Sequence, residues 1–370
     1  MAIKNIWHSL AQDRCPCIHQ FKTAFFLLLT LTFLLLAVAY ASDFTLDTIT
    51  FPKTWFTKIM NQTHYKVNDS IWADHNQKDT LAHLPNQQIQ QRGSTISYHI
   101  AHPSNYHYIL DEPDKCQQSP FLVLMVPVAP HQVEARNAIR STWGNESTVQ
   151  GNAVMTLFLV GLTGGSDSEK AQQQLEEESR QHRDLLQSNF VDSYYNLTIK
   201  TMVIMDWLAT RCPQASFSMK VDSDMYLNLE NLVTLLLAPN TPRQNYITGM
   251  VMWNRPVIRD TNSKWYVSEE SYPEPIYPTY LLGMGYVFSN DLPEKIVEAS
   301  KEIKPFNIED AYVGACVKHL GFAPSSPPDP SQFRAYLGQY KREDFLRVIT
   351  TILGSPQQLI DIWKDLKRPT

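Results

Sequence analysis

The sequence predicts an α/β domain in which helices cover both faces of a mainly parallel β-sheet. Short apolar runs alternate along the chain with longer segments of helical periodicity, and this alternation is typical of parallel strands joined by helices. The apolar runs contain few polar residues, as strands that are buried on both faces do. A longer apolar segment at residues 24–41 stands apart from these runs and predicts one N-terminal transmembrane helix.

The segment 24–41 carries no charged residue and is long enough to cross a thin bilayer. Basic residues outnumber acidic ones before it, so the positive-inside rule puts a tail at residues 1–23 in the cytoplasm and the rest of the chain in the lumen. The alternative is a cleaved signal peptide, because small residues stand at positions 37, 39 and 41. We favour an uncleaved anchor, because the apolar run is longer than a usual signal core.

Residues 42–118 have the composition of a stem. They are rich in Gln, Asn, His and Asp and show no sustained strand or helix period, so we expect them to bury little apolar surface. Residues 119–370 are enough for one large domain with a substantial core. The net charge of −5 and the scattered basic residues argue against a nucleic-acid partner.

Acceptor sequences for N-glycosylation agree with a luminal location. In each of them an Asn is followed, after one residue, by Ser or Thr, and they begin at Asn61, Asn68, Asn145 and Asn196. The first two lie in the expected stem and the other two in the large domain.

The five cysteines divide by compartment. Cys15 and Cys17 precede the membrane segment, where they stay reduced or become palmitoylated. Cys116, Cys212 and Cys316 are luminal, and since three is odd, at most one disulfide forms among them. The first two of these each stand shortly before an apolar run. If those runs are neighbouring parallel strands, both cysteines lie at one edge of the sheet, which favours their pairing over either pairing with the third.

The strand period of 2 residues and the helix period of 3.6 residues predict the following elements in chain order. Residues 121–128 are apolar throughout and predict a buried strand. Residues 133–143 predict a helix whose Arg136, Arg140 and Trp143 share one face, because they stand four and three positions apart. An apolar run and then a polar segment with Glu and Arg at close spacing predict a strand and a helix, at residues 153–160 and 168–187.

The second half of the domain repeats the alternation. A helical segment leads through Pro213 into the buried strand 217–221, and another helical segment ends before Pro239. The expected helices are residues 197–210, 229–237, 292–302 and 310–320, and the remaining expected strands are residues 246–253, 264–268 and 283–289.

The strand 217–221 ends in two carboxylates, Asp222 and Asp224. A desolvated charge without a partner is costly, and a cation is one partner that would satisfy the pair. At the carboxyl edge of an α/β sheet, where such folds bind ligands, two hard oxygen donors suit Mg²⁺ or Mn²⁺ carrying phosphates. The competing interpretation is a solvated turn after a strand.

Seven segments in order resemble one family, the β-1,3-glycosyltransferases of the Golgi, which include galactosyltransferases and N-acetylglucosaminyltransferases. The segments are RNAIRSTWG (136–144), DSYYNLTIKT (192–201), KVDSD (220–224), KWYVS (264–268), GYVFS (285–289), EDAYVG (309–314) and IDIW (360–363). The resemblance implies the nucleotide-sugar-binding fold called GT-A. It also implies a single-span Golgi membrane protein whose luminal catalytic domain is residues 119–370.

The resemblance assigns roles at the nucleotide site. It makes Asp224 the direct ligand of Mn²⁺, with Asp222 beside the same ion or at the ribose. Arg136, Arg140 and Lys200 would bind uridine or the diphosphate, and Trp143 and Gly285 belong to the same site. The alternative for the three basic residues is that they are solvated side chains on helix surfaces.

Inversion at the anomeric carbon in one displacement requires a base that takes the proton of the acceptor hydroxyl. By resemblance that base is Asp310, which follows Glu309 at a helix start, whereas the residue types alone fit a helix cap. Aromatic residues of a Pro-rich loop could form a wall for the acceptor sugar or could simply pack together. They are Trp265, Tyr272, Tyr277 and Tyr280.

The sequence departs from the family in three places. Ser223 stands where the family often has a third Asp, and Leu281 and Leu282 stand where it usually has Cys-Ser. Many members carry a His four residues before the Pro that opens the last helix, and counting back from Pro356 gives Ile352. If that His completes the metal shell in relatives, this protein binds Mn²⁺ more weakly, uses water instead, or has lost activity. His319 is expected to be an ordinary helix residue.

Two functional hypotheses result. The first is transfer of galactose from UDP-galactose to the 3-hydroxyl of N-acetylglucosamine or N-acetylgalactosamine on glycoproteins or glycolipids, with transfer from UDP-N-acetylglucosamine as its near neighbour. The second is a catalytically silent Golgi protein that binds sugars or partner transferases, and a homodimer stays open under both. The chain retains Asp222, Asp224, Glu309 and Asp310, and this favours activity.

Overall fold

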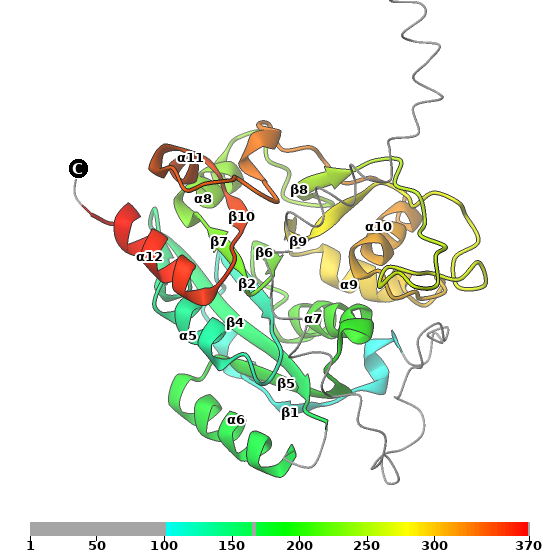
Figure 1. Cartoon of the computed structure of the whole chain (residues 1–370), viewed down its shortest axis with the longest axis horizontal. Helices are drawn as coiled ribbons and strands as arrows, with labels where there is room; N and C mark the ends of the chain where they lie inside the picture. Colours follow the sequence, from blue (N-terminus) through cyan, green and yellow to red (C-terminus); the bar gives the residue numbers. More distant parts are fainter. Residues whose placement is uncertain (1–100, 165–167, 369–370) are drawn as a thin grey trace, which may run out of the picture. The chain divides into compact units, whose positions relative to one another are not determined.

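The computed structural model describes residues 101–164 and 168–368, which form an α/β domain (Figure 1). The expected tail, membrane segment and most of the stem, with Asn61 and Asn68, lie outside the described residues. Within the described part of the chain, no helix is both long and apolar enough to cross a membrane.

The main sheet has eight strands and is parallel at its centre. Its order is β1-β5-β4-β2-β6-β9-β8, with β3 paired to β4. The four central strands are β5 (Leu185–Val191), β4 (Asn152–Leu162), β2 (Leu122–Pro127) and β6 (Phe217–Val221), and each pair of neighbours among them is parallel. The antiparallel additions are β1 (Tyr108–Leu110), β3 (Thr148–Val149), β9 (Tyr280–Ser289) and β8 (Ile247–Met252). A separate antiparallel pair joins β7 (Met225–Leu227) to β10 (Thr350–Ile352).

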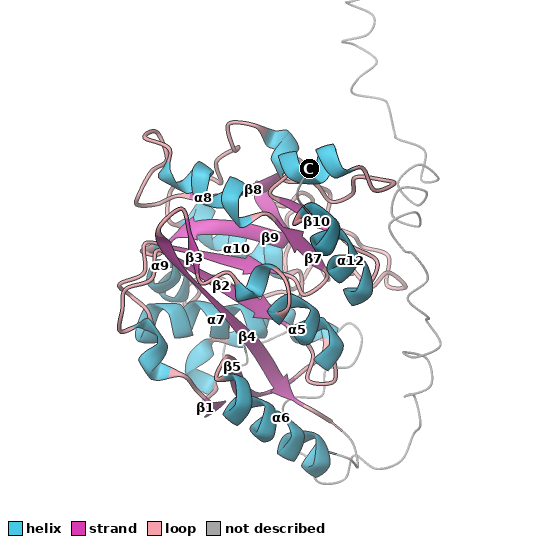
Figure 2. Ribbon diagram, turned by 90° about the vertical axis from the view of Figure 1, so that its left-hand side faces the viewer, coloured by secondary structure: helices cyan, strands magenta, loops and turns pink. Residues whose placement is uncertain are grey.

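Helices cover both faces of the sheet, as the sequence predicts (Figures 1 and 2). Side chains of β2 alternate between two apolar clusters, with Val123 in one and Leu124 in the other. The first cluster contains α7 (Leu197–Arg211), α9 (Leu292–Ala299) and α10 (Glu309–His319). The second contains α5 (Val133–Arg140), α6 (Ser168–His182), α8 (Leu229–Leu237), α11 (Arg342–Arg347) and α12 (Pro356–Leu366). Short 3₁₀ turns are η2 (Pro103–Asn105), η3 (Pro113–Cys116), η4 (Trp143–Asn145), η5 (Tyr194–Asn196) and η6 (Pro330–Gln332).

Two of the predicted elements are wrong. The helix expected at 168–187 ends at His182, because Arg183 takes a left-handed conformation with φ of 55°, and the apolar residues after it form β5. The strand expected at 264–268 is loop, although Val267 donates a backbone hydrogen bond to the carbonyl of Ile258 at 3.0 Å.

The folded domain begins before the expected boundary at residue 119. Ala101 and Cys116 are buried in the core, and β1 pairs with β5. The Tyr108 hydroxyl donates to Asp206 of α7 at 3.0 Å, so this segment is tied to a helix as well as to a strand. Residues 101–118 therefore belong to the domain and not to the stem.

The free edge of β8 is covered at its first two residues by the segment around Ser325. The backbone of Ser325 donates to the carbonyl of Ile247 at 2.9 Å, and the Thr248 hydroxyl donates back to the Ser325 carbonyl at 2.7 Å. This contact continues the hydrogen bonding of the sheet by one residue beyond its last strand.

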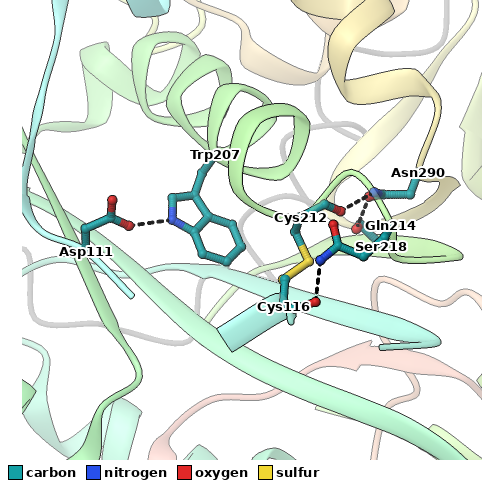
Figure 3. The surroundings of a disulfide bond; sticks show 7 residues. All are labelled: Asp111, Cys116, Trp207, Cys212, Gln214, Ser218 and Asn290. Atoms are coloured by element: carbon teal, nitrogen blue, oxygen red, sulfur yellow. Dashed lines mark hydrogen bonds between the residues drawn. A yellow bond between two sulfur atoms is a disulfide. The ribbon is translucent and has the colours of Figure 1, made fainter. Parts of the chain in front are cut away.

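Cys116 and Cys212 form a disulfide (Figure 3). Cys316 is a buried free thiol in α10. The two cysteines precede neighbouring parallel strands, as expected, because β2 and β6 are paired in parallel with Leu122 opposite Phe217. The carbonyl oxygens of both cysteines accept hydrogen bonds from side chains, that of Cys212 from Asn290 at 2.7 Å and that of Cys116 from Gln214. The disulfide therefore ties η3 to the end of α7.

Replacing both disulfide cysteines by Ala should lower the free energy of unfolding by about 2–5 kcal/mol, because the bond closes a loop of 96 residues. Dithiothreitol should lower the melting temperature of the wild type and of Cys316→Ala, but not that of the double variant. A double variant that stays sensitive to dithiothreitol would contradict the assignment.

Candidate active site

The turn that carries the two carboxylates is fixed on three sides. The backbone of Asp222 donates to the Met284 carbonyl of β9 at 2.9 Å. The Asp224 carbonyl accepts from the backbone of Leu353 at 2.8 Å, directly after β10. The indole of Trp143 donates to the Met225 carbonyl at 3.0 Å. The position of this turn therefore depends on three segments distant in sequence.

Lys220 connects this turn to the start of α10. Its ammonium is buried inside β6 and donates to Asp222 Oδ1 at 2.7 Å and to the carbonyl of Gly283. Glu309 Oε2 lies 3.5 Å from the same ammonium. Burial disfavours the charge, but the Asp222 and Glu309 carboxylates outweigh it and raise the pKa of Lys220. One cation thus joins acidic residues from two elements.

Glu309 and Asp310 form the first turn of α10 against β9. Glu309 accepts from the buried Tyr286 hydroxyl at 2.7 Å. Asp310 accepts from the backbone of Gly283 at 3.0 Å and from that of Ala311 at 2.8 Å. Burial and, after it, the charge of Glu309 raise the pKa of Asp310 to about 7. Asp310 is the second residue of the helix and not its N-cap, which is Ile308 and makes no side-chain cap hydrogen bond. Asp310 has the pKa of a base that works near neutrality.

The Asp224 carboxylate meets the chemical requirements of a cation ligand. Its side chain is exposed and accepts a hydrogen bond from its own backbone N–H, which leaves further lone pairs of the carboxylate for coordination. Surrounding protein still displaces much of the bulk water, and this desolvation, with the charge of Asp222, raises the pKa of Asp224 to about 7. Among the described residues, no three His, Cys, Asp or Glu side chains converge on one point. The donor set therefore fits a hard divalent cation that takes its other ligands from phosphate and water.

The residue at the position of the family's His lies beside this turn. Ile352 of β10 is paired with Met225, which follows Asp224 directly. The segment that departs from the family thus lies next to the acidic turn, and it contributes an apolar side chain there.

Two of the basic residues expected at the nucleotide are held in the protein framework. The Arg136 guanidinium is fully buried and donates to Glu178 at 2.6 Å and to two backbone carbonyls. Arg140 pairs with Glu178 and with Asp184, each at 2.7 Å. These ion pairs fasten α5 to α6 and to the start of β5. A contact with a nucleotide would require them to break.

Lys200, Trp143 and Gly285 are likewise enclosed. The Lys200 ammonium donates to Asp192 at 2.7 Å and to the Val128 carbonyl at 2.9 Å. Burial lowers the pKa of Lys200, although Asp192 opposes the change. Trp143 is fully buried, and Gly285 is paired with Val221 inside the sheet.

The predicted aromatic wall divides into two groups. Tyr272 packs against Tyr277 and Phe306, with ring centres 5.4 and 5.0 Å away, and Tyr280 is buried. Trp265 is partly exposed, and the ammonium of Lys264 lies 4.8 Å from its ring centre. Tyr272 is also partly exposed, so both groups retain some aromatic surface, and the second group combines it with a cation.

A further aromatic residue, Tyr194, joins the second group. Its ring centre lies 5.6 Å from the Lys264 ammonium. Two hydrogen bonds bring both segments to the residues just before α10: Asn307 donates to the Tyr266 carbonyl at 3.2 Å, and Thr198 donates to the Phe306 carbonyl at 2.8 Å. Burial and then the charge of Asp310 raise the pKa of Tyr194 to about 12. Tyr194, Lys264 and Trp265, called here the aromatic platform, thus lie near Asp310.

The two glycosylation acceptors within the described residues differ. Asn145 is exposed on η4. Asn196 is buried, and its amide donates to the Val191 carbonyl at 2.8 Å. A glycan at Asn196 stays a prediction that the folded chain disfavours, because the side chain is only 4% exposed and its amide already donates one hydrogen bond.

Gly283 allows the two acidic elements to approach each other. A Cβ atom there would lie 3.0 Å from Glu309 Oε2 and 3.4 Å from Asp310 Oδ2. Gly283→Ala should therefore displace the carboxylates and lower the free energy of unfolding by about 1–3 kcal/mol. Guanidinium chloride unfolding measures this change.

Gly164→Ala is the matched control. A Cβ atom there would meet nothing within 4 Å, so the variant should stay within about 0.5 kcal/mol of wild type. Equal stability of the two variants would contradict the packing described around Gly283.

Comparisons with known proteins identify the family of this chain. The profile of the family described as galactosyltransferase matches residues 134–328. Human beta-1,3-galactosyltransferase 2 is 44% identical over 271 residues, which are 72% of this chain and 64% of that protein. Mouse beta-1,3-galactosyltransferase 1 is 39% identical over 266 residues, 71% of this chain and 79% of the other.

The matched region thus spans slightly less than two thirds of beta-1,3-galactosyltransferase 2. Among solved structures, that of the galactosyltransferase LgtC with donor and acceptor sugar analogues has a TM-score of 0.33 and 9% identity, and it covers 67% of this chain and 97% of that one. From the profile match and the identity to these relatives, the chain belongs to the galactosyltransferase family.

Proposed function

We propose that this protein is a β-1,3-galactosyltransferase of the GT-A type, which transfers galactose from UDP-galactose to the 3-hydroxyl of an acceptor sugar. The observation that carries the proposal is the junction of two acidic elements through Lys220, one with Asp222 and one with Glu309 and Asp310. A glycosyl transfer needs both, one for the diphosphate and one for the acceptor hydroxyl. The names of the relatives support galactose as the sugar.

Asp224 and Asp222 would hold a divalent cation, which we take to be Mn²⁺. When bound, it supplies Lewis-acid stabilisation of the charge that develops on the departing diphosphate. Lys220 holds the Asp222 carboxylate in one orientation through its 2.7 Å hydrogen bond. The exposed Asp224 carboxylate is the group with a free coordinating position.

Asp310 is the general base. The two backbone N–H groups that donate to its carboxylate fix both oxygens relative to β9 and α10. Asp310 takes the proton of the acceptor 3-hydroxyl as that oxygen bonds to the anomeric carbon, while the bond from this carbon to the UDP oxygen breaks. Attack from the face opposite the leaving group inverts the configuration.

The acceptor sugar would lie on the aromatic platform beside this base. Exposed aromatic faces stack on the apolar C–H face of a sugar ring, and Lys264 offers a hydrogen-bond donor. We propose N-acetylglucosamine or N-acetylgalactosamine on glycoproteins or glycolipids as the acceptor. We also propose a single-pass Golgi protein with a luminal catalytic domain, an assignment that the Cys116–Cys212 disulfide supports, since disulfides persist in oxidising compartments.

One observation favours the silent alternative: Ile352 supplies no ligand beside the acidic turn. Assays of the full chain in detergent distinguish the two functions. UDP-galactose and UDP-N-acetylglucosamine are each offered with Mn²⁺ and a β-linked N-acetylglucosamine acceptor, and NMR identifies the linkage in the product. We expect a β-1,3-linked galactose.

Calorimetry of UDP binding tests the cation site separately from turnover. UDP should bind more tightly in Mn²⁺ than in EDTA, and Asp224→Asn should abolish the difference. Absence of transfer together with absence of Mn²⁺-dependent UDP binding would establish the silent alternative.

Asp310→Asn should lower kcat by roughly 10² or more, because an amide cannot take the hydroxyl proton. In the wild type the base must be ionised, so activity should rise as the pH increases through about 7. The variant should lose this dependence and still bind UDP. Asp361→Asn, at an exposed position on α12, is the control and should keep both rate and pH profile. A wild-type rate that stays flat between pH 6 and 8 would exclude Asp310 as the base.

A further inference from the structure

A pocket of about 350 Å³ lies between the end of β8 and the segment 326–336. Its lining includes Val251 and Trp253 on the β8 side and Phe333, Arg334 and Tyr336 on the other. The side chains of Trp253 and Tyr336 are 57% and 52% exposed. Two large aromatic residues at one opening are unusual on a folded surface and indicate a binding function.

The topology puts this pocket at the edge of the sheet that carries the active site. Strands β6 and β8 are both antiparallel to β9, so they end at the same edge. Two strand spacings, roughly 10 Å, separate β6 from β8 across the sheet, and β8 runs further along β9, since Val221 pairs with Gly285 whereas Met252 pairs with Tyr280. On its other wall, the Ala335 carbonyl accepts from the backbone of Ile352 at 3.3 Å, and Ile352 is paired with Met225.

The strand between the pocket and the base is β9. Val251, which lines the pocket, is paired with Leu281 of β9, and Gly283 of the same strand donates to Asp310. Asp310 begins α10, which packs in the first apolar cluster, whereas Met250 and Phe333 of the pocket pack in the second. A chain of sugars whose last residue lies at Asp310 would therefore reach the pocket by passing the end of β9.

The chemistry of the lining fits an uncharged carbohydrate. The walls are largely apolar, with Arg334 and Ser326 as polar side chains, and none of the lining residues is acidic. Aromatic rings stack on sugar rings, while a guanidinium donates hydrogen bonds to hydroxyl groups. The volume is at the lower end of the range of ligand sites.

We infer that this pocket is a second sugar subsite, which holds an inner residue of the acceptor glycan while the terminal sugar lies at Asp310. The inference rests on the proposed transferase function and narrows its substrate class. The acceptor is an oligosaccharide of at least two residues, and the protein prefers it over a single sugar.

The test compares two acceptors with the same terminal sugar, methyl β-N-acetylglucosaminide and the trisaccharide GlcNAcβ1-3Galβ1-4Glc. With the full chain, kcat/KM should be higher for the trisaccharide. Trp253→Ala should raise KM for the trisaccharide and so lower the ratio of kcat/KM for the trisaccharide to kcat/KM for the single sugar. We expect a decrease of about tenfold, the size expected for loss of one stacking contact. Trp253→Phe should restore most of the ratio. Leu346→Ala, which is 48% exposed on α11 and outside the pocket, should leave the ratio unchanged.

Saturation-transfer NMR of the trisaccharide with wild type and Trp253→Ala gives a readout that does not need turnover. Loss of the signal in the variant, even when neither acceptor is galactosylated, would support the subsite while the proposed activity fails. An unchanged ratio, or equal losses for both acceptors, would overturn the subsite while the activity stands. The same trisaccharide linked to ceramide serves as a third acceptor. If Trp253→Ala lowers kcat/KM only for this ceramide-linked form, the pocket binds lipid and the sugar subsite is overturned.

Discussion

The ammonium of Lys220 is the interaction on which the site depends. It lies inside the sheet, and it holds together carboxylates that would otherwise repel each other, one at the end of β6 and one at the start of α10. A buried cation is costly unless it is paired, and here the pairing also determines where the two acidic segments lie. Tyr286 and Gly283 complete the arrangement, the first by a hydrogen bond to Glu309 and the second by leaving space for it.

The sequence predicts the parts of the fold that are continuous in the chain. Central strands such as β2 and β6 are uninterrupted apolar runs, so their burial follows from composition. The junction of α6 and β5 was not predictable in the same way, because only two residues separate a polar helix from an apolar strand. Strands β7 and β10 are too short to show a period, and each exists through its pairing with the other.

The sequence predicts which acidic residues belong to the site, but it does not predict which residues surround them. The pattern at Arg136 and Arg140 correctly indicates one helical face, but which partner that face meets depends on α6, about forty residues later. Glu309, the second ion-pair partner of Lys220, and Lys264, which lies over the Tyr194 ring, likewise come from distant segments. Sequence patterns identify charged residues, whereas the tertiary fold decides whether they bind a ligand or each other.

The contact of Ser325 with β8 has a consequence for assembly. The outermost strand of a sheet is a template onto which another molecule can add a strand, and proteins block such templates to avoid aggregation. Here Ser325 of the same chain forms hydrogen bonds with Ile247 and Thr248 of the outermost strand, β8. Ser325 lies next to a run rich in proline. An intermolecular sheet that continues along the whole of β8 is therefore blocked at Ile247 and Thr248.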